Sequence, residues 1–142
     1  MLKRVAMIAV LILVGIIFFT FYMYREQNLG DVLNIEQVER VLIVTDDKNR
    51  PNGVEIPKID QEKKDQLIAF LNQYQVKLSM KEGWFSDYPS EQFNLYLVYK
   101  NGEPEVFTIE QEVVATTEIY EIVNAPLDYQ WIQEFERKLN SE

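Results

Sequence analysis

The sequence of 142 residues contains no cysteine and no histidine. Without cysteine the chain can form no disulfide, has no thiolate nucleophile and cannot carry a lipid on a thiol. Without histidine it lacks the most frequent general base, and without either residue it lacks the usual zinc ligands. We therefore expect no bound cofactor and no metal centre, with one loop considered below as a possible exception.

Positive charge is scarce, with 14 Lys and Arg against 23 Asp and Glu. Lys3, Arg4 and Arg25 precede the first acid, so residues 26–142 hold 11 basic and 23 acidic residues, a formal charge of −12. Nucleic-acid binding depends largely on basic side chains that neutralise phosphates, so we predict no nucleic-acid partner. The same charge opposes a domain lying flat on an anionic bilayer. It is compatible with plain solubility, a basic protein partner or a bound cation.

Residues 5–24 (VAMIAVLILVGIIFFTFYMY) contain neither charge nor proline. As a helix they extend about 30 Å, the thickness of a hydrocarbon core. Twelve of these residues are Val, Ile, Leu or Phe, which favours insertion by on the order of 4–7 kcal/mol. Tyr22 and Tyr24 stand at one end, where aromatic rings prefer the membrane interface. The segment predicts a transmembrane helix.

Two other kinds of N-terminal segment begin in the same basic way. A cleaved signal peptide ends in small residues three apart, whereas residues 18–23 here are bulky, so we predict an uncleaved signal anchor. A pilin-like leader has a glutamate early in its apolar stretch, but the first acid here is Glu26. Lys3 and Arg4 then place residues 1–4 in the cytoplasm and the acidic part outside the cell membrane.

The remaining chain predicts a tether followed by one domain. Residues 25–34 are polar and read as a short tether, and residues 35–142 read as an extracytoplasmic domain. Apolar residues recur at helical spacing over 60–74, with Asp60 as N-cap, and again in a closing helix that Pro126 opens. The sequence predicts strands over 41–45, 76–80, 92–100, 105–109, 113–116 and 119–123.

Short turns join the predicted strands, as in the hairpin at Asn101-Gly102, where both residues tolerate positive φ. Such connections indicate an antiparallel sheet. We therefore predict an α+β fold, in which the transmembrane helix precedes a small antiparallel sheet with two amphipathic helices packed on it.

The loop over 46–53 is the nearest approach to a cation site, since Asp47, Asn49 and Asn52 offer oxygen ligands. Pro51 stands where an EF-hand pattern requires a further oxygen ligand, and two basic residues lie within the loop. A plain hairpin turn is the interpretation that we prefer.

An aromatic segment, Trp84-Phe85-Ser86-Asp87-Tyr88-Pro89, lies in the loop over 81–91. Tryptophan and tyrosine are frequent in the centres of protein interfaces, so Trp84, Phe85, Asp87 and Tyr88 form the candidate partner-binding site. The rings also suit stacking on sugars, with Asp87 and Glu91 accepting hydroxyl hydrogens. The structural alternative is that the rings fold back and cap the core.

Four glutamates, Glu103, Glu105, Glu110 and Glu112, flank the second arm of the hairpin. Paired carboxylates hydrolyse glycosides only when they face each other across a cleft of about 5–9 Å. Nothing in the sequence supplies such a cleft, so we expect a solvated row of charges that protects a sheet edge.

Several short stretches resemble one group of exported domains. They are Ile35/Val38/Val41/Ile43, Asp87-Tyr88-Pro89, Tyr96-Leu97-Val98-Tyr99 and Ile119-Tyr120-Glu121-Ile122. Together with the amphipathic helix expected in the middle of the domain, they resemble small membrane-tethered extracytoplasmic domains of unknown function from Gram-positive, Bacillus-like bacteria. Members with a lipid anchor have a cysteine after the apolar stretch, which this chain lacks. The resemblance implies no functional residue.

The sequence favours a non-enzymatic, single-pass membrane protein whose outer domain binds a protein near the bilayer, as an accessory subunit or an inhibitor. The first alternative is a sensor domain for a ligand or glycan, which requires a concave pocket lined by aromatics. A hydrolase that uses carboxylates is the remaining hypothesis.

Overall fold

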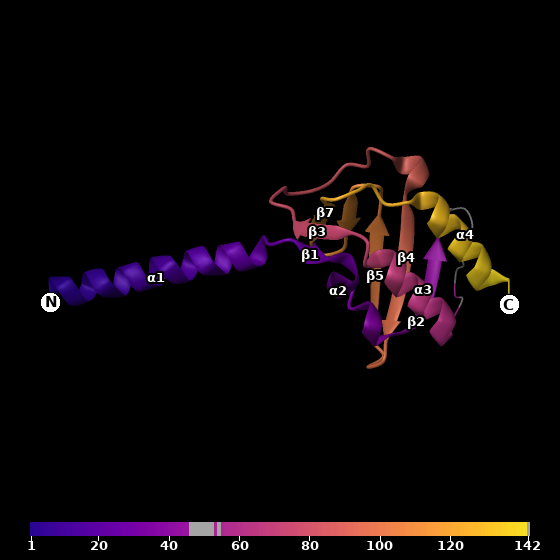
Figure 1. Ribbon diagram of the computed structural model, residues 1–142, viewed down its shortest axis with the longest axis horizontal. Coiled ribbons are helices and arrows are strands. Elements are labelled where there is room, and N and C mark those ends of the chain that lie inside the picture. Colours follow the sequence, from indigo (N-terminus) through magenta and orange to yellow (C-terminus); the bar gives the residue numbers. More distant parts are fainter. Residues whose placement is uncertain (46–52, 54, 142) are drawn as a thin grey trace.

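The computed structural model describes residues 1–45, 53 and 55–141, and the first helix extends away from all the other elements (Figure 1). Helix α1, Leu2–Met23, has 22 residues, about 33 Å at 1.5 Å per residue. Its segment Lys3–Met23 is long and apolar enough to cross a membrane or to serve as a signal anchor. None of this segment is buried against the rest of the chain.

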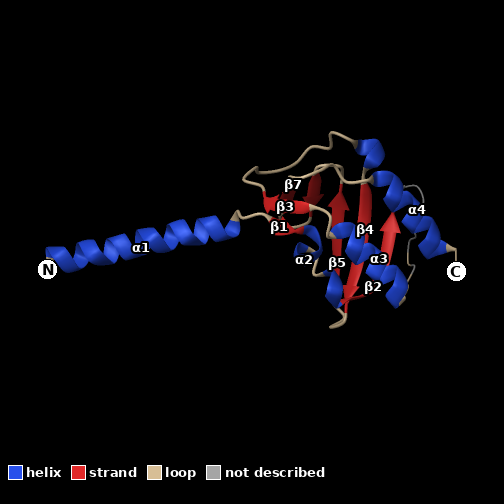
Figure 2. Cartoon of the chain, viewed as in Figure 1, coloured by secondary structure: helices blue, strands red, loops and turns tan. Residues whose placement is uncertain are grey.

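The remaining elements build an antiparallel sheet with helices beside it, so the predicted α+β class is confirmed (Figure 2). The sheet has seven strands in the order β1-β3-β7-β6-β5-β4-β2. The strands are β1 Gln27–Asn28, β2 Val38–Val44, β3 Gln75–Leu78, β4 Phe93–Tyr99, β5 Pro104–Ile109, β6 Val113–Ala115 and β7 Ile119–Ile122.

Among the described residues, two longer and three short helical elements accompany the sheet, namely α2 Leu29–Val32, η1 Ile35–Gln37, α3 Gln61–Leu71, η3 Pro89–Glu91 and α4 Tyr129–Asn140. Asp60 caps α3 as predicted, because its carboxylate accepts the Lys63 N–H at 2.8 Å. The prediction that Pro126 opens the last helix is wrong. Helix α4 begins at Tyr129, since the Asp128 carboxylate accepts the Trp131 N–H at 3.1 Å and caps the helix there.

The core lies between one face of the sheet and the two amphipathic helices. The alternate residues Phe93, Leu95 and Leu97 of β4 are buried, because successive side chains of a strand point to opposite faces. They belong to one cluster with the apolar residues of α3 and α4. The Trp131 ring of α4 stacks on Phe70 of α3, with ring centroids 3.8 Å apart.

The β4–β5 hairpin forms at Asn101-Gly102 as predicted, although with a different turn. Gly102 adopts φ 87°, whereas Asn101 does not have positive φ. The Gly102 N–H donates to the Tyr99 carbonyl at 2.8 Å, and the Tyr99 N–H donates to the Glu103 carbonyl at 3.0 Å. The connection is therefore a turn that ends in one left-handed glycine, which is the usual three-residue hairpin loop.

The expected tether over 25–34 is folded and belongs to the domain. Residues 27–28 form β1 beside β3, and Leu29 and Leu33 have no exposed surface. Gly30 passes so close to α3 that an added Cβ would lie 2.2 Å from the Asn72 amide oxygen. The composition of this segment is polar, but its two leucines are spaced to face the core together. Only residues 24–26 separate α1 from the sheet.

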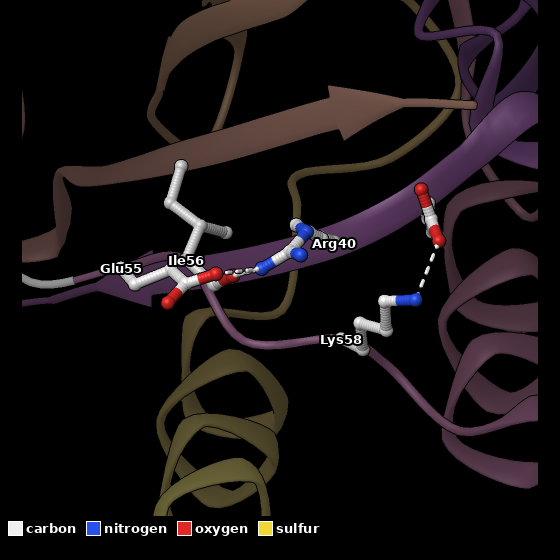
Figure 3. A network of polar contacts seen from close by, with 5 residues as sticks. Arg40, Glu55, Ile56 and Lys58 are labelled. Carbon is white, nitrogen blue, oxygen red and sulfur yellow. Dashed lines mark hydrogen bonds and ion pairs between the residues drawn. The ribbon is translucent and has the colours of Figure 1, made fainter. Parts of the chain in front are cut away.

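The segment before α3 covers the outer edge of β2 (Figure 3). Arg40 Nη1 donates to the Glu55 carboxylate at 2.6 Å and to the Ile56 carbonyl at 3.1 Å. Lys58 Nζ lies 3.0 Å from the Glu39 carboxylate, and its hydrogen bond lowers the pKa of Glu39. A covered edge is protected from pairing with a strand of another molecule.

Candidate functional site

The aromatic loop, defined here as residues 79–88, connects β3 to η3 and exposes most of its candidate residues. Phe85 is 93% exposed and Tyr88 is 40% exposed, while Asp87 is exposed and Trp84 is partly buried. The structural alternative, in which the rings cap the core, is therefore wrong for Phe85. Phe85 is therefore available for contact with a partner surface.

Glu110 holds the base of the aromatic loop. This residue comes directly after β5 and is 2% exposed. One carboxylate oxygen accepts the Ser86 hydroxyl, and the other lies 3.3 Å from the Tyr88 N–H. The expectation that Glu110 belongs to a solvated charge row is thus wrong, because Ser86 and Tyr88 supply donors that compensate its burial. This carboxylate fixes the loop from which Phe85 projects.

A concave surface, which we call the acidic hollow, lies between the aromatic loop and strands β6 and β7. It encloses about 470 Å³. Trp84 and Phe85 line one side, and carboxylates come from both the loop and the sheet. The complete lining is Ser79, Lys81, Gly83, Trp84, Phe85, Asp87, Glu112, Val113, Ile119, Glu121 and Ile122.

The charge of the acidic hollow is negative. Asp87, Glu112 and Glu121 contribute carboxylates, whereas Lys81 is the single basic residue in the lining. Lys81 Nζ lies 3.4 Å from the Glu121 carboxylate, which also accepts the Ser79 hydroxyl at 3.2 Å. Asp87 and Glu112 are left to attract cations, and aromatic faces nearby also favour cations. The hollow is therefore suited to a basic side chain or an amine.

The four glutamates predicted as a row do not act together. Glu110 is buried, Glu112 lines the acidic hollow, and Glu103 is exposed at the β4–β5 turn. Glu105 is partly buried and lies 3.0 Å from the Tyr99 hydroxyl. Burial, reinforced by Glu105, raises the pKa of that hydroxyl.

Glu103 and Glu105 also share a second hollow of about 360 Å³ beside the turn, which Tyr99 and Lys100 help to line. The two carboxylates come from one stretch of chain rather than from opposite walls. This arrangement differs from the facing pair that glycoside hydrolysis requires.

The cation loop predicted at Asp47, Asn49 and Asn52 lies outside the described residues. Within residues 1–45, 53 and 55–141, no group of three or more acidic side chains is placed to hold a metal ion.

Sequence reasoning found the aromatic loop but missed the residues that complete its surroundings. Lys81, Glu112 and Glu121 reach the acidic hollow from different elements, and Ser86 meets Glu110 across 24 positions of sequence. No local pattern marks these contacts, because each brings together residues from different elements of the fold. The position of Glu110 directly after a predicted buried strand was the one sequence feature that could have indicated a carboxylate beside the core.

Comparisons with protein-family models, with curated proteins and with solved structures found no match. We therefore infer the function from the chain's own residues.

Proposed function

We propose that this chain is a single-pass protein of the cell membrane whose outer domain binds a protein partner next to the bilayer, without catalysing a reaction. Helix α1 spans the membrane in this proposal, with Lys3 and Arg4 on the cytoplasmic side. The partner engages the aromatic loop and the acidic hollow. In such a role the domain is an accessory subunit or an inhibitor of a membrane-bound assembly.

The observation that carries this proposal is the exposure of Phe85, which is 93%, on a loop that Glu110 fixes. A large apolar side chain held in water by an ordered loop is stabilised when a partner covers it. The acidic hollow beside it adds charge complementarity for a basic segment. Because three residues connect α1 to the sheet, the partner must reach this surface close to the membrane.

The test is a photo-crosslinking amino acid at Phe85 in intact cells, combined with charge reversals. We expect one product, identified by mass spectrometry, that becomes at least about tenfold weaker with Asp87→Lys or Glu112→Lys. The control is Glu134→Lys, an exposed acid of α4 outside the hollow, which should leave the product unchanged. Equal yields from all variants would contradict the acidic hollow as the docking surface.

A ligand- or glycan-binding sensor is a second candidate, favoured by the concave shape and by Trp84 in its wall. It predicts a saturable change of Trp84 fluorescence on titration with soluble cell-wall oligosaccharides. Trp131 is partly buried against the core cluster and is the other tryptophan of the chain, so a Trp131→Phe background isolates the Trp84 signal. A response that persists in Asp87→Asn would argue against binding in the hollow.

A further inference from the structure

A second exposed apolar side chain, Met80, lies at the end of the domain nearest to α1. It lies two residues after the end of β3 and is 81% exposed. In Figure 1 the loop that leaves β3 begins beside the end of α1 from which the chain enters the domain. Met80 and Phe85 line different hollows, since Phe85 belongs to the acidic hollow and Met80 does not.

Met80 and α1 enclose a groove of about 450 Å³, which we call the membrane groove. Its helical side extends from Ile16 to Tyr24, about 12 Å along the axis at 1.5 Å per residue. The lining consists of Ile16, Ile17, Thr20, Phe21, Tyr24, Arg25 and Met80. Met80 is therefore the residue of the domain that lies beside the last turns of α1.

The walls of the membrane groove are suited to lipid rather than to water. Thr20, its one polar side chain within α1, already donates its hydroxyl to the Ile16 carbonyl at 2.8 Å. Arg25 stands at the rim, with its guanidinium 4.0 Å from the centre of the Tyr22 ring. An apolar wall with a cation at its outer end matches a phospholipid, with acyl carbons below and phosphate above.

We propose that Met80 enters the outer leaflet beside α1 and that a phospholipid fills the membrane groove. This inference rests on the proposed function, because it requires α1 to span the bilayer. Met80 is the one residue of the domain that contacts lipid in this proposal. A small contact is consistent with the formal charge of −12 on residues 26–142, which opposes a flat approach to anionic lipids. A flexible methionine adapts to a fluid environment. The contact of Met80 with lipid adds to the anchoring by α1. It limits the tilt of the domain and holds the aromatic loop near the membrane surface.

The absence of native cysteine allows single cysteines to be labelled without background. The full-length protein carrying Met80→Cys with a nitrobenzoxadiazole label is placed in phosphatidylethanolamine–phosphatidylglycerol vesicles. We expect blue-shifted emission, strong quenching by lipids with a spin label on the acyl chain, and weak quenching by aqueous iodide. Because Met80 is exposed, the substitution should leave the far-ultraviolet circular dichroism unchanged.

Two controls separate failure of this inference from failure of the proposed function. Val10→Cys, in α1 outside the membrane groove, should report lipid if α1 spans the membrane, and Lys138→Cys on α4 should report water. Lipid at Val10→Cys with water at Met80→Cys overturns the inference alone. Water at both positions overturns the membrane span as well. Protection of Met80→Cys from both quenchers would show that a protein, such as a second copy, occupies the membrane groove. This result would also overturn the proposal that a phospholipid fills it.

Discussion

The two ends of the sheet differ in strand length and in what they expose. At one end, β2 and β4 have seven residues each and β5 has six, and the core with α3 and α4 lies against them. At the other end, β1, β3, β6 and β7 have two to four residues. The exposed Met80 and Phe85 both follow β3 at this end. We therefore expect the longer strands to contribute most of the stability, whereas the candidate contacts lie in the half beside α1.

The largest expected effect compares two phenylalanines. Phe135 of α4 is 1% exposed and stacks on Trp131 with centroids 4.8 Å apart. Phe135→Ala should lower the free energy of unfolding by about 3–5 kcal/mol, because it leaves a cavity in the core. Phe85→Ala should change it by less than about 0.5 kcal/mol. Denaturation of the protein in detergent micelles, followed by circular dichroism, measures both. Similar losses at the two positions would show that the aromatic loop belongs to the stable half.

A smaller effect is expected at Glu110, where the two halves meet. Glu110→Ala leaves the Ser86 hydroxyl and the Tyr88 N–H without their acceptor, which costs about 1–3 kcal/mol. Hydrogen exchange at residues 81–88 should become faster while exchange in β4 stays the same. Glu112→Ala, two positions later and exposed, is the matched control and should leave the loop protected. Faster exchange throughout the domain would mean that the loop and the core unfold together.

The smallest effect is a pH dependence in the stable half. The Lys63 backbone N–H lowers the pKa of Asp60 in the folded state. A carboxyl with a lowered folded pKa stabilises the fold above its unfolded pKa, and this contribution is lost as the pH falls through the folded pKa. Asp60→Asn keeps a capping oxygen but does not titrate. The stability difference between wild type and Asp60→Asn should therefore shrink as the pH falls below the ordinary range of aspartate. A constant difference would show that the charge of Asp60 contributes nothing.

Local sequence patterns predicted most helices and strands. The features that they did not predict depend on contacts between residues far apart in the sequence. The Asp60 cap, both amphipathic helices and the Asn101-Gly102 hairpin depend on residues within a few positions of each other, so the α+β class followed from the sequence. The segment around Leu29 and Leu33 was misread because its burial depends on α3 and β3, more than 30 residues away. The predicted start of α4 was wrong because the sequence offers both Pro126 as a first helical residue and Asp128 as an N-cap. The hydrogen bond from the Trp131 N–H to the Asp128 carboxylate shows which of them is used.

The candidate site shows the same division. Its aromatic residues were recognised from composition, since Trp84, Phe85 and Tyr88 crowd into one loop. Whether such rings lie in the core or in water depends on what covers them, which no local pattern records. The acidic hollow arises only when β6 and β7 pair beside the loop.

The short junction between α1 and β1 has a mechanical consequence. Residues 24–26 span at most about 11 Å when extended, and Tyr24 still bonds to the Thr20 carbonyl at 3.1 Å. A joint of this length keeps β1 within about 11 Å of the end of α1. Any pull that a bound molecule applies to the globular part therefore reaches the helix across only three residues.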